Sequence, residues 1–582
     1  MPLHIKSVSI RNFRCFKSLD LNIEQFTVLV GENGCGKTSI LEAVNLALSR
    51  NVTASKINEQ DFNADDEGGI EIEVVFDNLF IASLPDGYAS QPVPCDRVRL
   101  SVKRRERGAP GRALNDGFVI SHVVVPDSTV STTAKGWKVS RKSGRDFEFD
   151  QRALNMQSVD ASDLPRCFLF DRHRERQSSV GFSSTMSRLV EDLNWRFMNG
   201  LDPTGRAAYQ KQWEGIYATI LTAADSQKFK ESVREVQQRL VAMLGDHYDS
   251  LELSLVELER PFAKSFFATR DGLNQVAQDG LGSGVSLIIS YLLLEAIRKM
   301  SKESLVILID EPELHLHPQL QAQFCSHLRT AGFDVILSTH AAAMINFADW
   351  RGVKRINRGG ICHPTVATLA RELPVEGKPR AVSEHLEDIR AYRQNETVFF
   401  REARDLLFAR GVVLVEGPVD RYGIEVLADR HGLDLRDLTI ICCHGKTKIP
   451  HYQILCHAFG VPFITIMDKD LHSKNEGDRK PNDMIFEWAM PGHLFAFENS
   501  FENALGVTEK KHKTTEAMNA IDDYDFDALI QEVSDMFLAL KAFAVAVRTG
   551  TVPMMLDIIL PEQPAEATPE AGTEPEQKAG LN

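Results

Sequence analysis

The sequence contains no long apolar run and no export signal. No stretch approaches the roughly 18 apolar residues of a membrane-spanning helix. The longest candidate, around Val285 to Leu294, is interrupted by serine and tyrosine. The N-terminal segment MPLHIKSVSIRNFRCF also lacks the apolar core of a signal peptide. These absences predict a soluble protein that is neither secreted nor bound to a membrane.

Cysteine pairs and an excess of positive charge are also missing. The nine cysteines are scattered, without a CxxC pair or a histidine at zinc-binding spacing, which predicts a reducing, cytoplasmic setting. Lys and Arg number 66 against 81 Asp and Glu, and the net charge of −15 excludes a general attraction to nucleic acid. DNA contact must therefore be local. Two basic stretches could supply it, unless they are only solvated faces: Val102–Arg107 with Arg112, and Lys510–Lys513.

The rest of the composition is that of a folded chain with several domains. Hydrophobic residues make up 43% and charged residues 25%, so wholesale disorder is excluded. At roughly 100–200 residues per domain, the length of 582 residues predicts two to four domains. Strand and helix patterns alternate, which indicates a multidomain α/β protein.

We expect the following division of the chain. A nucleotide-binding domain is split into residues 1–165 and 256–379 by a helical insert at 166–255, whose apolar positions three and four apart predict a dimerisation element. A connecting helix at 380–409 leads to a second α/β domain at 410–560. The remaining residues, 561–582, are rich in Glu and Pro with one large apolar residue, which predicts a disordered tail.

The first motif is a phosphate-binding loop, Gly31–Thr38, with the pattern GxxxxGKT. It follows an expected strand at 26–30 and precedes a helix that carries Ile40, Val44 and Leu48 on one face. Its glycines let backbone N–H groups surround phosphates, while the lysine reaches the β and γ oxygens and the threonine hydroxyl holds Mg²⁺. The predicted nucleotide-binding residues of this loop are Asn33, Gly34, Gly36, Lys37, Thr38 and Ser39.

The second motif, LVILIDEPELHLHP, places Asp310 and Glu311 at the end of a five-residue apolar strand. At the C-terminal edge of a sheet, Asp310 would orient Mg²⁺ and Glu311 would position or activate the attacking water. Taken alone, two acids after a strand are also typical of a turn or a helix cap. A third strand, DVILSTH, ends at His340, whose ring could hydrogen-bond the γ-phosphate.

Together, IRNFRCF, GENGCGKTS, DEPELHLHP and ILSTH resemble the ATPase head shared by ABC-type DNA-repair and SMC-like proteins. The resemblance implies ATP as the ligand and a signature loop supplied by a second copy of the chain. Its best match is Leu281–Ser286, with Ser283 and Gly284 as nucleotide contacts, although Gly282 and Val285 replace the usual Ser and Gln. Because the insert spans only residues 166–255, the long coiled coil of SMC-like heads is excluded.

The third motif is a set of carboxylates at the ends of two strands. VVLVEGPVD places Glu416 after an apolar strand and Asp420 on the first turn of a helix, and PFITIMDKD places Asp468 and Asp470 two residues apart. Alternate side chains of a strand point the same way, so all four should converge. Carboxylates at this density suit Mg²⁺ or Mn²⁺, although each pair alone could be a solvated turn.

The ordered set E-G-x-x-D, parallel strands and D-x-D resembles the Toprim domain of topoisomerases, primases, small nucleases and the OLD (overcoming lysogenization defect) family. An ABC-type head with a helical insert and a Toprim domain on one chain is the OLD-family layout. The resemblance therefore implies an ABC-type ATPase head split by a helical dimerisation insert and followed by a Rossmann-like Toprim domain. Gly445 and Lys446 match the glycine-turn position of the family.

Further site residues follow from this resemblance alone. Glu502 stands at a metal-binding Glu of the family, although Ser500 replaces the usual Asp, and Glu498 is the alternative. Lys541 resembles the late catalytic Lys, which would stabilise developing phosphate charge, or it is a plain surface lysine. The predicted catalytic residues are Glu416, Asp468, Asp470, Lys541 and Glu311, and the predicted metal ligands are Glu416, Asp420, Asp468, Asp470, Glu502, Thr38 and Asp310.

The leading hypothesis is an ATP-regulated, Mg²⁺- or Mn²⁺-dependent DNA endonuclease or nicking enzyme in bacterial anti-phage defence, working by two-metal hydrolysis. The resemblance implies that the substrate is DNA, that the protein forms a homodimer or tetramer, and that a helicase-like or other defence protein acts with it. It also implies that bound nucleotide inhibits the nuclease. Two alternatives stay open. One is an ATP-switched DNA-binding clamp whose Toprim domain is not catalytic; the other is a topoisomerase or primase, for which few residues follow Asp470.

Overall fold

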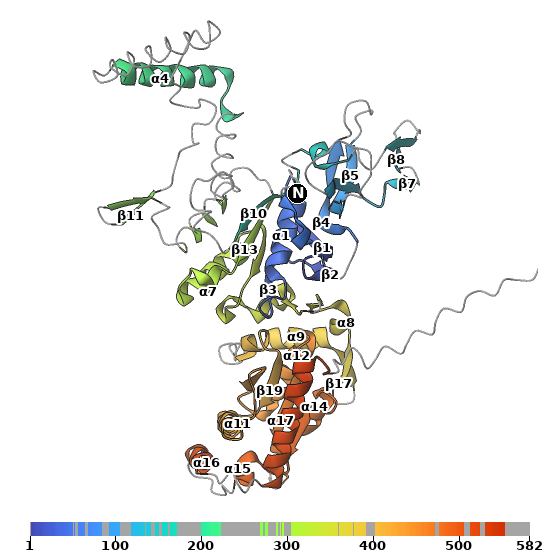
Figure 1. Ribbon diagram of the computed structural model, residues 1–582, viewed down its shortest axis with the longest axis vertical. Helices are drawn as coiled ribbons and strands as arrows, with labels where there is room; N and C mark the ends of the chain where they lie inside the picture. The colour runs from blue at the N-terminus through green and yellow to red at the C-terminus, as the bar shows by residue number, and fades with distance from the viewer. Residues whose placement is uncertain are drawn as a thin grey trace, which may run out of the picture. The chain divides into compact units, whose positions relative to one another are not determined.

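The computed structural model divides the chain into two compact units (Figure 1). The first unit comprises Met1–Lys6, Leu41–Lys56 and Ile72–Thr339, and the second comprises Ser7–Ile40, Ile57–Glu71 and His340–Asn582. The structure describes residues 2–50, 52, 56–64, 68–83, 92–104, 118–133, 136–140, 146–149, 154–160, 163–171, 199–222, 268–271, 274–277, 284, 287–288, 291–292, 294–295, 304–358, 360–375, 378–391, 402–471, 476–505, 513–523 and 530–552.

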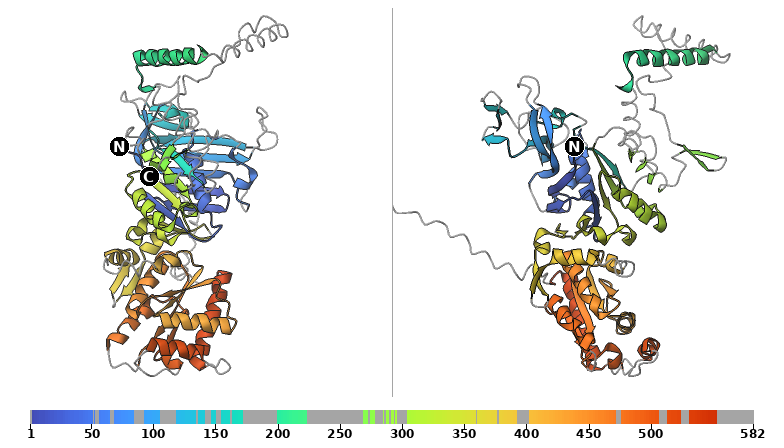
Figure 2. Two further views of the ribbon diagram at one scale, coloured as in Figure 1. Left: turned by 90° about the vertical axis from the view of Figure 1, so that its left-hand side faces the viewer. Right: turned by 180° about the vertical axis from the view of Figure 1, so that it is seen from behind.

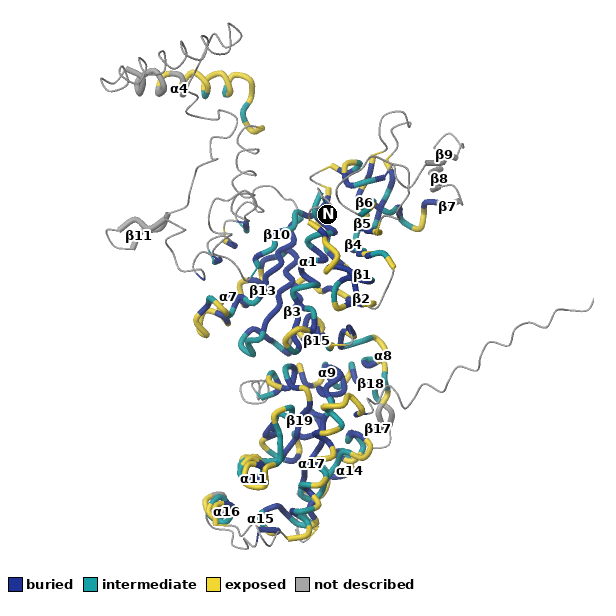
Figure 3. Tube along the Cα trace, viewed as in Figure 1, coloured by how far each residue is buried: buried dark blue, intermediate teal, exposed yellow. Residues whose placement is uncertain are grey.

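Three parallel strands organise the first unit. β13 (Leu305–Asp310) lies between β10 (Arg166–Phe170) and β14 (Asp334–Ser338), and α7 (Pro318–Arg329) connects β13 to β14. All of β13 and β14 is buried (Figure 3), as expected of parallel strands that are covered on both faces. The apolar run of LVILID therefore forms the predicted strand that leads to the second motif.

The first unit also contains antiparallel strands. β4 (Ile70–Ser83), β5 (Pro92–Arg104) and β6 (Phe118–Pro126) are neighbours in that order. Alternate residues of β5 are buried, which agrees with the β-branched alternation of the sequence. The smaller elements are β7 (Ser131–Thr133), β8 (Gly136–Ser140), β9 (Asp146–Phe149), β11 (Ala268–Asp271), β12 (Asn274–Ala277) and α4 (Pro203–Thr222), a described helix of the expected insert.

The second unit begins with the strands around the phosphate-binding loop. β1 (Ile5–Phe13) and β2 (Phe16–Asn22) form an antiparallel hairpin. β3 (Phe26–Val30) is fully buried and pairs in parallel with β15 (Val353–Ile356), which pairs with β16 (Cys362–His363). α1 (Lys37–Leu48) follows the loop, and its predicted apolar face of Ile40, Val44 and Leu48 is buried.

A second parallel sheet forms the C-terminal part of this unit. Its strand order is β20 (Leu438–Cys442), β19 (Gly411–Val415), β21 (Phe463–Asp468) and β22 (Leu494–Phe497), all parallel. The chain therefore crosses first from β19 to β20 and then in the opposite direction to β21. Two of these strands, β19 and β21, are the strands that the sequence predicts before Glu416 and at Asp468.

Helices cover both faces of this sheet (Figures 1 and 2). Right-handed crossovers place α11 (Pro418–Arg430) on one face, and α12 (Ile449–Ala458) with α14 (Pro481–Trp488) on the other. α12 packs against both β19 and α14, which agrees with this placement. The arrangement is the doubly wound, Rossmann-like fold that the sequence predicts.

Shorter elements complete the second unit: α8 (Val366–Leu369), β17 (Glu372–Val375), β18 (Lys378–Ala381), α9 (Val382–Ala391), α13 (Glu476–Arg479), α15 (Phe501–Ala504), α16 (Lys513–Asp522) and α17 (Gln531–Thr549). The expected connecting helix at 380–409 does not start at residue 380, because β18 extends to Ala381. The helix α9 starts at the next residue, Val382. The predicted tail at 561–582 lies outside the described residues. No helix in the described part of the chain is long and apolar enough to span a bilayer.

Candidate functional site

The phosphate-binding loop has the backbone shape that its glycines allow. Gly31, Gly34 and Gly36 have φ angles of 139°, 77° and 101°, a region that other residues rarely adopt. A Cβ on Gly36 would lie 2.3 Å from Cζ of Phe16 in β2. Glycine is therefore required at this position both by backbone conformation and by space.

The loop lysine is folded back onto the loop. Lys37 is 6% exposed, and its Nζ donates to the carbonyl oxygens of Gly31 and Glu32, each at 2.9 Å. To reach the phosphates of a nucleotide, Nζ must exchange these two carbonyls for phosphate oxygens. Thr38 and Ser39 follow in the first turn of α1, where the helix N-terminus favours an anion.

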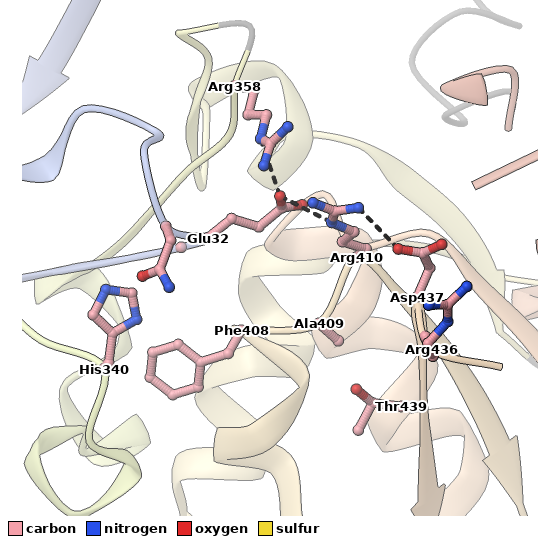
Figure 4. A pocket seen from close by; sticks show the side chains of 11 residues that line it. Glu32, His340, Arg358, Phe408, Ala409, Arg410, Arg436, Asp437 and Thr439 are labelled. Carbon is pink, nitrogen blue, oxygen red and sulfur yellow. Dashed lines mark hydrogen bonds and ion pairs between the residues drawn. The ribbon is translucent and has the colours of Figure 1, made fainter. Parts of the chain in front are cut away.

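A polar pocket of about 460 Å³ opens beside the start of the loop (Figure 4). Two of the predicted nucleotide residues, Asn33 and His340, line it, and the His340 ring lies 6.2 Å from that of Phe408. Sequence analysis did not name the remaining lining residues as ligand contacts. Gly31 and Glu32 lie in the loop motif itself, and no motif marks the others: Arg358, Phe408, Ala409, Arg410, Arg436, Asp437 and Thr439.

Ion pairs connect the charged residues of this pocket. Oε2 of Glu32 lies 3.1 Å from Nε of Arg410 and 3.2 Å from Nε of Arg358. Arg410 also donates through Nη1 to Oδ1 of Asp437 at 2.8 Å. The charge of Glu32 is the main reason why the pKa of Arg410 is raised. Sequence reasoning offered no signal for these pairs, because they join residues far apart in the chain.

The acids of the second motif lie in the first unit, at the C-terminal end of β13 and beside the end of β14. Asp310 is 1% exposed and accepts a short hydrogen bond from the hydroxyl of Ser338. The N–H of Glu311 donates to the carbonyl of Ser338 at 3.1 Å, and Glu311 adopts a φ of 45°. A left-handed backbone at a residue other than glycine is a strained conformation that often accompanies function. The expected placement at a strand end is thus observed.

The structure describes only part of the predicted signature loop. Ser283 lies outside the described residues. Gly284 is buried in the first unit, where a Cβ would lie 2.1 Å from the carbonyl oxygen of His315. Within the chain, this glycine therefore permits close packing against the segment that follows Glu311. Its predicted contact with the nucleotide of a second copy stays a prediction.

The third motif lies at the carboxyl edge of the C-terminal sheet. Glu416 directly follows β19, and Asp468 ends the adjacent parallel strand β21. Between these strands the chain switches from one face of the sheet to the other, and ligands of doubly wound sheets bind at such a point. Asp420 lies on the first turn of α11, where its Oδ2 accepts the N–H of Gly417 at 2.7 Å.

Asp468 is affected by three further acids. Burial raises its pKa well above the usual range, and the charges of Asp420, Glu416 and Glu502 raise it further. A hydrogen bond of 3.0 Å from the N–H of Phe501 to its Oδ1 acts in the opposite direction. These four acids are therefore close enough to repel one another, as the sequence analysis expects for three of them and the family resemblance implies for Glu502.

Ser500, the departure from the family pattern, has a structural role. Its hydroxyl accepts the N–H of Asn503 at 3.2 Å and so caps α15. Serine and aspartate are both good helix N-caps. The substitution therefore retains the cap of the short helix that carries Glu502 in its first turn.

The strand argument is wrong for Asp470. β21 ends at Asp468, and Asp470 has a φ of 53°, so the alternation of an extended strand does not reach it. Its Oδ2 instead lies 2.8 Å from Nζ of Lys446, a lysine whose side chain is 7% exposed. Sequence analysis had singled out Lys446 only as part of a glycine turn.

Two site residues that the family resemblance implies, Lys541 and Glu498, take no part in the contacts between the site carboxylates and Lys446. Lys541 is exposed on α17, and within the described part of the chain it forms no ion pair with the site carboxylates. Glu498 is also exposed, and its N–H donates to Oε1 of Glu532 at 3.3 Å. The structure thus brings together Glu416, Asp420, Asp468 and Glu502, and pairs Asp470 with Lys446.

The donor set is chemically suited to a divalent cation. Carboxylate oxygens are the ligands that Mg²⁺ and Mn²⁺ prefer, and a cation would relieve the repulsion that acts on Asp468. Among the residues that the structure describes, no three carboxylate, histidine or cysteine groups are close enough to hold an ion as they stand. Side-chain rotations would therefore have to complete the coordination.

Comparisons with known proteins agree with this two-part organisation. Residues 3–158 and 197–345 match the family described as AAA ATPase domain, and residues 407–470 match that described as Overcoming lysogenization defect protein-like, TOPRIM domain. The chain is 24% identical to the OLD nuclease of Thermus scotoductus, over 94% of this chain and 99% of that protein. It is 23% identical to the Old nuclease of Escherichia phage P2 and 20% identical to endonuclease GajA of Bacillus cereus, over 81% of this chain in both cases and over 78% and 76% of those proteins. The chain therefore belongs to the OLD nuclease family, with an AAA ATPase domain followed by an OLD-like TOPRIM domain.

Proposed function

We propose that the protein is a DNA endonuclease that nicks or cuts DNA, requires Mg²⁺ or Mn²⁺, and is regulated by ATP at the phosphate-binding loop. The observation that carries the proposal is the position of Glu416 and Asp468 at the carboxyl ends of adjacent parallel strands, with Asp420 and Glu502 near enough to raise the pKa of Asp468. The relatives named nuclease and endonuclease support the same activity.

In this proposal the chain holds divalent ions with Glu416, Asp420, Asp468 and Glu502. When bound, the ions would activate the attacking water and stabilise the leaving 3′ oxygen of a phosphodiester. The backbone N–H of Phe501 orients the Asp468 carboxylate, and the cap of α15 fixes Glu502. Lys446 neutralises Asp470, which becomes a further ligand only when that ion pair opens.

The ATPase part acts through its own residues. Lys37 would bind the β- and γ-phosphates, with Thr38 and Asp310 holding Mg²⁺ and Glu311 positioning water. The buried hydrogen bond between Ser338 and Asp310 fixes that carboxylate for its role. His340 lines the same pocket as Asn33, which supports its assignment to the γ-phosphate.

The biological setting is also a proposal. We place the protein in the cytoplasm, as a homodimer or tetramer through the insert at 166–255, acting on DNA in anti-phage defence with or without a helicase-like partner. Lys103 and Arg104 are exposed at the end of β5 and would contribute local DNA contacts. Of the other basic residues expected to contact DNA, Lys513 begins α16, whereas 105, 107, 112 and 510–512 lie outside the described residues.

Plasmid cleavage tests the proposal directly. Supercoiled plasmid should be converted to nicked or linear forms with Mg²⁺ or Mn²⁺ and remain intact in EDTA. Glu416→Gln should abolish the conversion, because it removes a charged ligand. Glu425→Gln is the matched control, since Glu425 is an exposed acid of α11 that pairs with Arg421, and it should cut normally. Cleavage that survives EDTA or Glu416→Gln would contradict the nuclease site, whereas a plasmid that stays intact with both Mg²⁺ and Mn²⁺ would favour the clamp.

A further inference from the structure

The pocket beside the phosphate-binding loop contains more positive charge than the nucleotide motifs explain. Three arginines line it, Arg358, Arg410 and Arg436, against the two acids Glu32 and Asp437. Figure 4 shows Glu32 and Arg410 meeting across the pocket, with Arg358 approaching the same carboxylate. Phosphate is the ligand whose geometry and charge best match several guanidinium groups.

Glu32 is connected to both the nucleotide lysine and these arginines. Its backbone carbonyl accepts Nζ of Lys37 at 2.9 Å, while one side-chain oxygen is shared by Arg410 and Arg358. When Lys37 turns to bind phosphate, the backbone of Glu32 loses a charged partner. Nucleotide binding therefore changes the hydrogen bonding of the same loop residue whose side chain pairs with Arg410.

Arg410 is a movable side chain on a fixed backbone. The guanidinium of Arg355, a buried residue, donates to the carbonyl of Ala409 at 2.9 Å and to that of Leu407 at 3.2 Å. The side chain of Arg410 itself is 42% exposed, and exposed ion pairs of this kind are weak and easily exchanged. Arg410 could thus leave Glu32 without disturbing the chain around it.

Arg410 is also well placed to affect the nuclease part. It directly precedes β19, and the other end of this strand delivers Glu416. Through Asp437 it continues an ion-pair series, because Oδ2 of Asp437 accepts Nε of Arg548 on α17 at 2.9 Å. A change in the partner of Arg410 would therefore act through this series of ion pairs, which reaches α17.

We infer that Arg410, assisted by Arg358, binds the terminal phosphate of the nucleotide held by the phosphate-binding loop, exchanging Glu32 for that phosphate. The TOPRIM part then reads whether the nucleotide carries a γ-phosphate. The inference rests on the ATP-binding part of the proposed function and adds the residue that discriminates ATP from ADP. A terminal phosphate attracts guanidinium groups more strongly than one carboxylate does, because it carries more charge and three acceptor oxygens.

Nucleotide binding to the full chain tests this inference. Calorimetry with Mg²⁺ would compare ADP with an ATP analogue that has a non-hydrolysable β,γ-imido bridge, in the wild type, Arg410→Met and Glu32→Gln. Arg410→Met should weaken the analogue about tenfold or more and leave ADP within about twofold. Glu32→Gln should tighten the analogue, because the competing carboxylate charge is removed.

Arg436→Met is the matched control. Arg436 lines the same pocket, but it is 88% exposed and forms its ion pair with Asp434. It should retain the wild-type preference for the analogue over ADP. An unchanged preference in Arg410→Met, or an equal loss in Arg436→Met, would overturn the inference.

The same binding measurements distinguish a failure of the proposed nucleotide site from a failure of the Arg410 inference. Wild-type protein that binds neither nucleotide, or Lys37→Ala that binds both normally, would overturn the nucleotide site itself and the inference with it. Lys37-dependent binding that does not depend on Arg410 would overturn only the inference. Where plasmid nicking responds to the analogue, Arg410→Met should reduce that response, whereas Arg436→Met should retain it.

Discussion

Nζ of Lys446 lies 2.8 Å from Oδ2 of Asp470, and the lysine side chain is 7% exposed. Asp470 is thus neutralised by a cation of the chain itself, beside a group of acids in which Asp468 has a raised pKa. A buried charge needs such a partner, because desolvation is costly. The pair shows that the TOPRIM site of this chain contains positive charge from Lys446, whereas Lys541 is exposed on α17.

Lys446→Met should therefore change how the site binds metal. Without the ammonium group, Asp470 adds uncompensated negative charge, so the Mg²⁺ concentration for half-maximal nicking should fall while the maximal rate falls about tenfold. A Mg²⁺ titration of plasmid nicking measures both quantities. Lys541→Met is the comparison, and its half-maximal Mg²⁺ concentration should match the wild type. A higher Mg²⁺ requirement in Lys446→Met would contradict the proposed competition between lysine and metal.

Removing a carboxylate should separate DNA cleavage from ATP hydrolysis. Glu416→Ala and Asp468→Ala each delete a metal ligand at the carboxyl edge of the C-terminal sheet, so nicking should fall at least a hundredfold, by rough estimate from losses at catalytic metal sites. ATP turnover should stay within about twofold, since Lys37 and Glu311 belong to the motifs of the ATPase domain and these acids to those of the TOPRIM domain. Phosphate release and plasmid nicking, measured on the same preparations, test this. Equal loss of both activities would point to unfolding or obligatory coupling.

The ATP motif itself should give two distinct phenotypes. Lys37→Ala removes the ammonium group that reaches the nucleotide phosphates and should weaken ATP binding about tenfold or more. Glu311→Gln keeps the shape of the side chain but not its basic charge, so it should bind ATP normally and hydrolyse it slowly. Calorimetry and phosphate release measure the two quantities separately. Equal ATP affinity in the wild type and Lys37→Ala would remove the loop from the site.

Much of this organisation can be predicted from the sequence, because it depends on local patterns. An apolar strand followed by GxxxxGKT requires glycine backbone angles that few other segments share, and the structure has them at Gly31, Gly34 and Gly36. Likewise, each continuous apolar run predicts a buried parallel strand, as found for β13, β19 and β21. The acids directly after these runs must then lie at the sheet edge.

Contacts between distant residues could not be predicted in this way. The Glu32–Arg410 pair joins residues 378 positions apart, and although Glu32 lies in the phosphate-binding loop, no motif marks Arg410. The predicted side-chain direction of Asp470 was wrong because the sequence does not show where β21 ends. The strand ends at Asp468, and side chains alternate only within the extended strand. The Ser500 substitution looked like a defect in the sequence, whereas its role as a helix cap is visible only from the contact with Asn503.

The stability of the second unit should depend on pH through buried histidines. Nε2 of His457 lies 2.8 Å from the carbonyl oxygen of Trp488, and burial lowers the pKa of His457 to about 4. Burial, together with the charge of Arg355, also lowers the pKa of His363 to about 4. In the unfolded chain a histidine has a pKa of about 6.5. Between pH 6.5 and pH 4 the unfolded state therefore binds more protons than the folded state, and the free energy of unfolding falls as the pH falls.

For His457 alone, this difference should amount to about 2 kcal/mol between pH 7.5 and pH 5. Urea unfolding at the two pH values measures it. His457→Gln keeps an N–H donor for the Trp488 carbonyl but cannot titrate, so the variant should lose less stability than the wild type over this interval, by about that amount. The wild type and His457→Gln should accordingly differ more at pH 7.5 than at pH 5. Parallel pH dependences in the two proteins would show that folding does not lower the pKa of His457, which would contradict the burial argument.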